Sequence, residues 1–413
     1  MVGVGGAHRR AVRSLMRTVE EHQQVVAALL SPRAGVRLPL VEAEGLVLSA
    51  DVVAPLSLPV FDNSAMDGYA VYAPDIAEVP VTLPVAADIP AGRTDPLTLT
   101  PGTVHRIMTG APLPAGATAV VPVERTDGGT EVVEIRASAP DGQHIRTAGE
   151  DVTAGTTVLH AGQVVTSAAI GLAAALGIAE LEVVPRQRVL VMSTGTELVA
   201  PGVPLQPGQI YESNAPMLAA AVRDAGAVAT KAPMSSDDVD EFRAALLADL
   251  ANVDLIITTG GVSAGAYEVV KDALGDGQVE FAKVAMQPGM PQGAGSVGSQ
   301  GRRVPIVTLP GNPVSALVSF EVFVRPALRA AMGRPDAGRL QHTAELTEAL
   351  TSPPGKRQFR RGVYDPATGT VTGYGPPASH HLRYLASANC LLEIPEDVTE
   401  VAAGSPVRVW DLT

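Results

Sequence analysis

The chain has 413 residues, more than one ordinary hydrophobic core accommodates, so the length predicts roughly two to four domains. A net charge of −13 and few aromatic residues, 1 Trp, 7 Tyr and 6 Phe, exclude a nucleic-acid surface that depends on basic patches and stacked rings. An anionic ligand therefore needs a local site. The 41 Gly and 34 Pro residues indicate many turns. Their combined share of the chain is below that of low-complexity disordered chains.

The cysteine content and the N-terminal segment indicate the compartment. Cys390 is the only cysteine, so no disulfide can form within the chain, and we expect a buried thiol in a reducing cytosol. Residues 1–22 carry charges where a signal peptide has its apolar core, and no run approaches about 18 apolar residues. We therefore expect a cytoplasmic protein that binds neither membranes nor nucleic acids.

The N-terminal third begins with helical character. Apolar residues between 10 and 30 recur at three- and four-residue spacings, which predicts an amphipathic helix ended by SPRAG at 31–35. Residues 39–55 predict a short helix that leads into an extended segment. No chemistry is visible here, and a packing or dimer-forming element is the interpretation we favour.

A polar loop follows at 58–75, where Asp62, Asn63, Ser64 and Asp67 lie within six positions. These residue types form ordinary turns as well as binding sites, so both interpretations stay open. Residues 79–134 alternate short β-like runs with Gly and Pro turns, which predicts a small all-β domain. It contains Thr109 on a second candidate loop.

Helical character returns at 144–186. Ser167 can cap a helix that starts at Ala168 and ends near Gly177, because serine is a good N-cap and glycine a common stop. The similarity to the N-terminal segment suggests that the all-β piece is inserted into a discontinuous first domain.

From Gln187 to about residue 332 the pattern becomes strand, loop, helix, which predicts a parallel α/β sheet. The buried strand at 253–259 ends in a glycine loop with Gly260 and Gly261, where backbone amides could approach an anion; a tight turn is the alternative. The strand at 304–309 leads to Asn312 as N-cap and to a helix whose first amides point to the same sheet edge. After Gly333 short strands predict a second small β domain.

The motifs, taken together, resemble a known family. DNSAMDGYA, RIMTGAPLP, IRTAGEDV, STGTEL, GGVSAG, QPGMPQG, LPGNPVSA and AN-LLEIPE look like the bacterial MoeA-type molybdopterin molybdenumtransferases and the similar E domain of gephyrin. The resemblance implies a homodimer of four-domain subunits. The domains would be a discontinuous helical domain (1–57 and 145–185), an inserted β domain (58–144), a doubly wound MogA-like α/β domain (186–332) and a C-terminal β barrel (333–413).

The family inserts molybdenum from molybdate into adenylylated molybdopterin and releases AMP. Such chemistry needs alignment and charge neutralisation, and Mg²⁺ typically uses one or two carboxylates with substrate phosphates. The resemblance therefore implies Mg²⁺ as cofactor and other proteins of molybdenum cofactor biosynthesis as candidate partners. It also implies a site shared between subunits, with the Asp62 loop of one facing the 253–265 loop of the other.

Roles follow residue by residue from the matching motifs. The resemblance assigns catalysis to Asp62, Thr109, Glu197, Asp237 and Lys283, and the metal to Glu197, Asp237 and Glu268. It assigns substrate binding to Ser64, Gly260, Gly261, Ser263, Pro310, Gly311, Asn312 and Ser315, with Arg361 and Ser379 as donors for molybdate.

Each of the charged assignments has a simpler alternative. Asp237 could be a helix N-cap, Lys283 a solvated strand residue, and Arg360 and Arg361 an exposed basic turn. His380 and His381 lack the carboxylate or cysteine company that a zinc site needs.

The sequence departs from the family pattern at several charged positions. Thr196 replaces an aspartate, the loop after GGVSAG has Ala266 and Glu268 where aspartates are usual, and the family's KPGKP reads QPGMP at 287–291. Two carboxylates and two ammonium groups are lost together, so the local charge balance is kept. Because an unpaired charge in a closed site is costly, we interpret these changes as compensating; a weakened site is the alternative.

Two other functions fit parts of the sequence. The α/β domain alone would suit a MogA-like molybdopterin adenylyltransferase, which would turn over ATP with metal-free molybdopterin. A non-catalytic, gephyrin-like scaffold or degenerate paralogue is the alternative from another class. The DNSAMDGYA loop and the additional β domains resemble the molybdenumtransferase alone.

Overall fold

A computed structural model of the protein describes residues 16–232, 238–260, 269–274, 277–299 and 301–413. The chain forms two compact units. One contains Met1–Val36 and Val184–Thr413, and the other is Arg37–Val183. Each unit is described by itself below.

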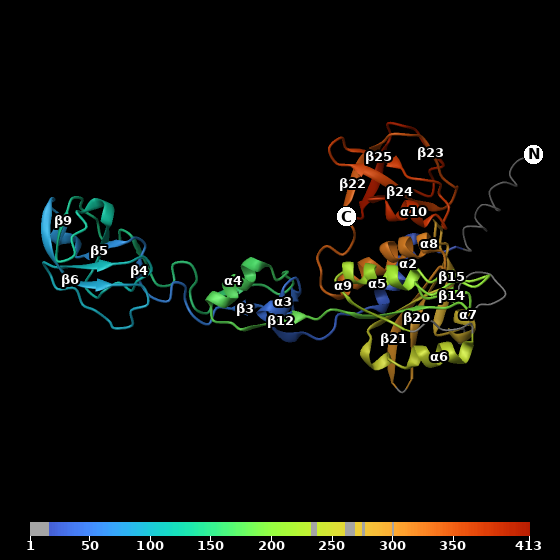
Figure 1. Cartoon of the computed structure of the whole chain (residues 1–413), viewed down its shortest axis with the longest axis horizontal. Helices are drawn as coiled ribbons and strands as arrows, with labels where there is room; N and C mark the ends of the chain where they lie inside the picture. The colour runs from blue at the N-terminus through green and yellow to red at the C-terminus, as the bar shows by residue number, and fades with distance from the viewer. Residues whose placement is uncertain (1–15, 233–237, 261–268, 275–276, 300) are drawn as a thin grey trace, which may run out of the picture. The chain divides into compact units, whose positions relative to one another are not determined.

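The first unit contains a six-stranded sheet in the order β16-β13-β17-β21-β20-β18. Figure 1 labels two of its strands, β20 and β21. Four strands pair in parallel, and β20 is antiparallel to both of its neighbours. The strands are β13 (Arg188–Ser193), β16 (Val228–Lys231), β17 (Leu255–Thr259), β18 (Val279–Lys283), β20 (Pro291–Ser299) and β21 (Arg302–Leu309). A two-residue parallel pair, β14 (Leu198–Val199) with β15 (Ile210–Tyr211), follows β13.

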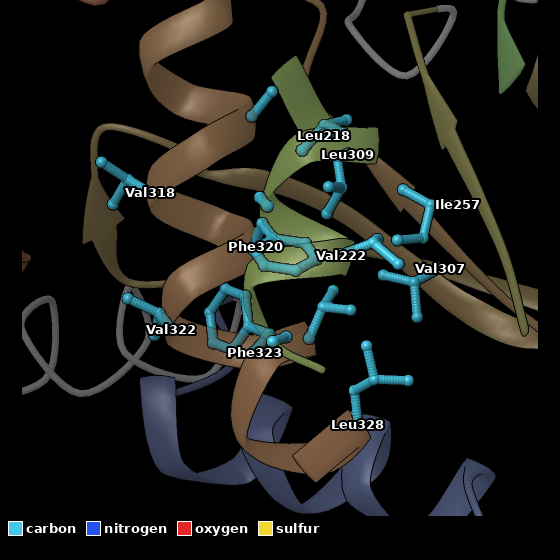
Figure 2. Packing of buried hydrophobic residues seen from close by; sticks show 14 of the residues in the cluster. Leu218, Val222, Ile257, Val307, Leu309, Val318, Phe320, Val322, Phe323 and Leu328 are labelled. Carbon is cyan, nitrogen blue, oxygen red and sulfur yellow. The ribbon is translucent and has the colours of Figure 1, made fainter. Parts of the chain in front are cut away.

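Helices cover both faces of this sheet, which confirms the predicted doubly wound α/β domain. Ile257, Val307 and Leu309 pack in one cluster with Phe320 and Leu218, as Figure 2 shows. On the opposite face Ile256 and Ile306 pack with Phe242 and Val270. The helices are α2 (Val19–Leu29), α5 (Asn214–Asp224), α6 (Val239–Leu247), α7 (Val269–Leu274), α8 (Pro313–Ser319) and α9 (Arg325–Ala331), with a π-helical turn at Phe320–Val324 and a 3-10 turn at Leu250–Asn252.

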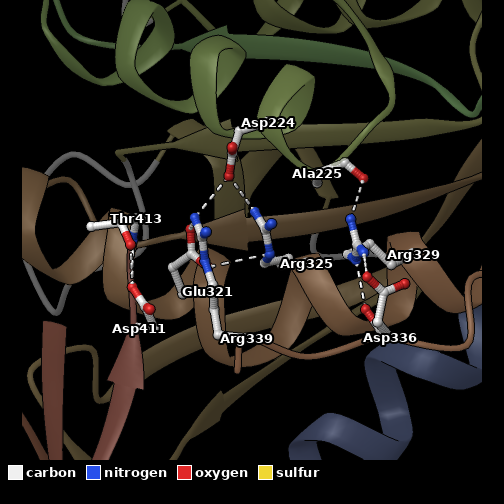
Figure 3. A network of polar contacts seen from close by, with 9 residues as sticks. All are labelled: Asp224, Ala225, Glu321, Arg325, Arg329, Asp336, Arg339, Asp411 and Thr413. Atoms are coloured by element: carbon white, nitrogen blue, oxygen red, sulfur yellow. Dashed lines mark hydrogen bonds and ion pairs between the residues drawn. The ribbon is translucent and has the colours of Figure 1, made fainter. Parts of the chain in front are cut away.

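An ion network joins the π-helical turn to the end of α5 (Figure 3). Arg339 donates to Glu321 at 2.8 and 3.1 Å and to Asp224 at 2.8 Å. Arg325 also donates to Asp224, at 2.6 Å. Glu321 is 2% exposed and Arg325 6%, so these charges are stable in the protein only as pairs.

The C-terminal part of the same unit is a closed five-stranded barrel, as predicted. Its strands follow the order β24-β25-β22-β28-β26, and pairing of β26 with β24 closes the barrel. The strands are β22 (Gln341–Leu346), β24 (Arg357–Asp365), β25 (Thr370–Gly373), β26 (Cys390–Ile394) and β28 (Pro406–Asp411), with α10 (Leu382–Ala386) and the small pair β23 (Leu350–Thr351) and β27 (Glu400–Val401) beside them. Cys390 is buried, as expected. A short strand from the α/β domain, β19 (Met286–Gln287), extends this sheet by pairing in parallel with β24.

The second unit contains the predicted all-β segment as a five-stranded sheet in the order β8-β5-β7-β6-β9. These strands are β5 (Gly68–Val71), β6 (Val81–Ile89), β7 (Val104–Ile107), β8 (Ala119–Pro122) and β9 (Val132–Ile135), with 3-10 turns at Ala73–Ile76 and Val123–Arg125. The rest of the unit has α3 (Leu40–Ala43) and α4 (Ser167–Ala175) with β1 (Val36–Pro39), β2 (Val47–Leu48), β3 (Val52–Val53), β4 (Asn63–Ser64), β10 (Ile145–Arg146), β11 (Thr157–Leu159) and β12 (Glu180–Val184).

Two helix boundaries differ from the sequence expectation. The N-cap of α4 is Thr166, whose hydroxyl accepts from the amide of Ala169, so Ser167 is the first helical residue and not the cap. Both residues are good caps, and the extended backbone of Thr166 decides between them. The N-terminal helix is described from Val19, after a capping box between Thr18 and Glu21, and residues 10–15 of the predicted segment lie outside the described ranges.

Candidate active site

Three neighbouring strands of the α/β sheet end at the same level. Ser193 of β13 pairs with Thr259 of β17, which in turn pairs with Leu309 of β21. The residues that follow each strand therefore emerge side by side at the carboxyl edge, where open α/β sheets bind their ligands.

The loops after these strands contact one another closely. Gly260 has φ +95°, and a Cβ added there would lie 2.9 Å from the carbonyl oxygen of Thr194. A Cβ on Gly311 would lie 3.5 Å from the Cα of Gly260. Only glycine fits at 260, so the chain presents its backbone without a side chain at this position, which favours the approach of an anion.

The third loop leads into α8. Asn312 is the N-cap residue and Pro313 the first helical residue, as predicted, but the Asn312 side chain makes no capping bond. Its Nδ2 donates instead to the Oγ of Ser379, at 3.1 Å. The Asn312 side chain therefore leaves the first-turn amides of α8 uncapped, and it joins this loop to the barrel. Ser315 lies in that first turn and is buried.

Arg361 lies beside Ser379 and is only 4% exposed, which rules out the exposed basic turn considered for it. Its Nη1 donates to the carbonyl of Ala378 at 3.0 Å and its Nη2 to that of Pro376. Its Nε is buried and, within the described residues, has no hydrogen-bond partner. Burial, and then neighbouring Arg360, lowers the pKa of Arg361. A buried cation with a spare donor is suited to an oxyanion.

Glu197 and Lys283 lie at the same edge of the sheet and are both exposed. The Glu197 carboxylate lies against Gly195, where an added Cβ would be 2.6 Å from Oε2. Lys283 ends β18, which runs parallel to β21 two positions away in the sheet, about 10 Å at the usual strand spacing. Lys283 is thus at the correct edge but not beside the glycine loops.

Four predicted site residues lie outside the described ranges, namely Asp237, Gly261, Ser263 and Glu268. The helix N-cap considered for Asp237 is Asp238, whose Oδ1 accepts from the amides of Asp240 and Glu241, each at 2.9 Å.

The other predicted residues gather in the second unit. Asp62 accepts from the amide of Ala148 at 2.7 Å, and the buried hydroxyl of Ser64 donates to the carbonyl of Met66 at 2.5 Å. Thr109 is adjacent, since the amide of Gly110 donates to the carbonyl of Ser64. The predicted loops at 58–75 and 105–122 thus meet and form one polar cluster.

Asp67 and Asn214 are two residues that we did not assign to the site from the sequence. The amide and hydroxyl of Thr109 both donate to Oδ1 of Asp67 at 2.6 Å. The side-chain bond from Thr109, and then its backbone bond, lowers the pKa of Asp67. Asn214 links two strand-end loops. The position of Asp67 in the DNSAMDGYA motif could have identified it as a site residue. Asn214 carried no such signal, because the sequence shows it only as an ordinary first residue of a helix.

Within the described ranges, no group of three or more His, Cys, Asp or Glu side chains is placed to hold a metal ion. None of the helices that the structure describes has the length and apolar content that crossing a bilayer requires.

Family models match nearly the whole chain. They are "MoeA N-terminal region (domain I and II)" over residues 17–177, "Probable molybdopterin binding domain" over 190–330 and "MoeA C-terminal region (domain IV)" over 343–412. These matches, on a chain with an α/β domain, a separate five-stranded sheet and a closed barrel, define a multidomain protein that contains a probable molybdopterin-binding domain.

Individual relatives narrow that class. Molybdopterin molybdenumtransferase 2 of Mycobacterium tuberculosis is 66% identical over 96% of this chain and 100% of its own length. Molybdopterin molybdenumtransferase of Haemophilus influenzae is 35% identical over 90% and 92%. The crystal structure of a molybdopterin biosynthesis MoeA protein from Pyrococcus horikoshii has a TM-score of 0.82 at 28% identity and covers 96% of this chain and 99% of its own. The chain belongs to the MoeA family.

Proposed function

We propose that this protein inserts molybdenum into adenylylated molybdopterin and releases AMP, as a transferase of molybdenum cofactor biosynthesis. The observation that carries the proposal is the contact of the Thr194, Gly260 and Gly311 loops at the carboxyl edge of the sheet, in a chain of the MoeA family. The 66% identity to a protein named molybdopterin molybdenumtransferase supports the same reaction.

The roles of the edge residues follow from their chemistry. Gly260, Gly261, Ser263, Pro310, Gly311, Asn312 and Ser315 would bind the pyrophosphate and the pterin through backbone amides and hydroxyls. Arg361 and Ser379 would bind molybdate, since the guanidinium has a buried donor without a partner among the described residues. Lys283 would contribute a cation at the border of the site.

Mg²⁺ is the cofactor that we propose, and it would neutralise charge on the phosphoric anhydride. The exposed carboxylate of Glu197 beside Gly195 fits an ion that takes one or two carboxylates together with substrate phosphates. Asp237 and Glu268 would complete the protein ligands. These carboxylates would also align the anhydride, because phosphoryl chemistry depends on positioning more than on a nucleophile.

We also propose a cytoplasmic homodimer in which each site uses two chains. Asp62, Ser64 and Thr109 would come from one subunit and the 253–265 loop from the other, because isologous dimers build sites from two surfaces of each subunit. The single buried cysteine is consistent with a reducing compartment.

AMP release tests the proposed reaction. Wild type, supplied with adenylylated molybdopterin, molybdate and Mg²⁺, should release AMP, and Glu197→Ala should be slower by tenfold or more, on the order expected for a metal-binding carboxylate. Equal rates would leave a scaffold role. ATP turnover with metal-free molybdopterin would instead identify an adenylyltransferase.

A further inference from the structure

Asn214, the first residue of α5, connects two of the strand-end loops. Its Nδ2 donates to the Oγ1 of Thr259 at 2.9 Å and to the carbonyl of Gly311 at 2.7 Å. The Thr259 hydroxyl then donates to the carbonyl of Pro310 at 3.1 Å. Asn214 therefore bridges the end of β17 and the loop after β21, and the bond from Thr259 to Pro310 joins the same two segments directly.

The position of Asn214 is itself fixed by a buried carboxylate. Glu212 is 5% exposed, and its Oε1 accepts from the hydroxyl of Ser193 at 2.9 Å and from the amide of Ala215 at 2.8 Å. Since Ser193 ends β13, the start of α5 is held to a third strand end. The brace spans the three loops that we propose as the phosphate-binding edge.

The orientation of the Asn214 amide group follows from its partners. The carbonyl of Gly311 can only accept, so the atom 2.7 Å from it must be the nitrogen. Both hydrogens of Nδ2 are then used, and Oδ1 remains as the only free position. Oδ1 is buried and has no hydrogen-bond partner within the described residues. A buried acceptor is costly when it is left unsatisfied.

We propose that Asn214 is a positioning residue of this edge, and that its Oδ1 accepts a hydrogen bond from a hydroxyl or amino group of the substrate. The two Nδ2 bonds keep the Gly260 and Gly311 loops in contact before a ligand arrives, which lowers the ordering cost of binding. The ligand contact rests on the proposed function, whereas the brace can be tested without any ligand.

The chain contains a matched control in Asn389. This asparagine also bridges backbone groups, with Nδ2 donating to the carbonyl of Tyr364 and Oδ1 accepting from its amide, both at 2.8 Å. Both the nitrogen and the oxygen of its side-chain amide therefore have a hydrogen-bond partner, and both partners lie in the barrel. Asn389→Ala should therefore lower stability without changing ligand affinity.

The test compares the full-length wild type, Asn214→Ala and Asn389→Ala. Without ligand, hydrogen exchange of residues 257–260 and 309–313 should be faster in Asn214→Ala alone. Titration with pyrophosphate, AMP or 6-hydroxymethylpterin should show affinities weaker by roughly tenfold to hundredfold in Asn214→Ala, the effect of losing about 1.4 to 2.8 kcal/mol.

The three ligands separate the two roles of Asn214. Pyrophosphate lacks the ribose hydroxyls of AMP and the amino and hydroxymethyl groups of the pterin, so its loss of affinity reports the brace. If Asn214→Ala weakens the affinity for AMP or for the pterin more than the affinity for pyrophosphate, the more affected ligand identifies the half of the substrate that donates to Oδ1. Equal losses for all three would overturn the Oδ1 contact, and unchanged exchange and affinity would overturn the brace. If wild type binds none of the ligands, the proposed function fails, but the exchange measurement still tests the brace.

Discussion

At the scale of single residues, two hydrogen bonds couple Thr109 to Asp67. Both donors of Thr109, its amide and its hydroxyl, go to the same carboxylate oxygen. Its hydroxyl hydrogen is therefore not available to a substrate, although its oxygen can still accept. Thr109 would serve the reaction by holding Asp67, and not by donating a proton.

Substitutions at this pair should be non-additive. Thr109→Val and Asp67→Asn should each reduce the rate of AMP release by about tenfold, and the double variant should lose no more than one of them, because both break one charge-assisted contact. Thr109→Ser keeps the hydroxyl and should retain most of the activity. Additive losses in single-turnover measurements would show that the two side chains act separately.

His22 gives the folded state a specific pH dependence. It is buried in α2 with its ring 4.6 Å from that of Phe323. Burial, and then the charge of Arg17, lowers the pKa of His22 to about 4. The unfolded chain takes up this proton near pH 6.5, so the unfolded state binds more protons between about pH 4 and 6.5 and stability falls as the pH is lowered through that window.

Replacing His22 should therefore flatten the acid side of the stability curve. His22 contributes on the order of 3 kcal/mol above pH 7 that is lost by pH 4. Urea unfolding of His22→Gln between pH 4 and 7 should show a smaller change than wild type by about that amount. His160→Gln, at an exposed histidine, is the control. An unchanged slope in His22→Gln would contradict the buried, neutral imidazole.

At the scale of elements, the π-helical turn depends on its ion network. Arg339 is the bidentate partner of Glu321, and both side chains are nearly buried. Arg339→Ala should cost about 3 kcal/mol in urea unfolding, because it leaves a buried carboxylate with Arg325 alone. Arg136→Ala, which removes an exposed pair with Glu134, should cost much less, because water and salt screen a surface pair. Similar costs for the two variants would show that the network contributes no more than a surface pair.

Local patterns predicted the elements well, because strand and helix periodicity depends on neighbouring residues. The buried runs that became β13, β17 and β21, and the cap at Asn312, were readable from the sequence. The contacts across loops were not. Asn214 lies 97 positions from Gly311, and Asn312 lies 67 positions from Ser379, so only the folded chain brings these side chains together.

The positions where this chain departs from the family pattern also have partners that the sequence alone does not reveal. The family resemblance implies a lysine where this chain has Gln287, but the partner of Gln287 is 71 positions away: the Nε2 of Gln358 donates to the Oε1 of Gln287 at 3.0 Å. An uncharged pair now occupies this position between β19 and β24. That arrangement is consistent with compensated charge loss, because Gln358 needs no ionic partner.

At the scale of the whole molecule, the candidate site residues belong to two compact units. Asp62, Ser64 and Thr109 lie in one unit, and Glu197 and the glycine loops lie in the other. The proposed homodimer accounts for this division if each site takes one set from each subunit.

Mixed dimers test the shared site. Subunits with Asp62→Ala and subunits with Glu197→Ala should each be nearly inactive alone. After random exchange, half of the dimers are mixed and each has one intact site, so about a quarter of wild-type activity should return. A mixture that stays inactive, although mass spectrometry shows mixed dimers, would place each site within one chain.

The most direct test of molybdenum insertion measures the molybdenum that is bound to the pterin as well as the AMP that is released. Adenylylated molybdopterin, molybdate and Mg²⁺ are allowed one turnover with the wild-type protein, and AMP and pterin-bound molybdenum are both quantified. If the protein inserts molybdenum, equal molar amounts of the two products should form, and no AMP should form when molybdate is omitted. AMP that forms at the same rate without molybdate, or a pterin product without molybdenum, would contradict molybdenum insertion.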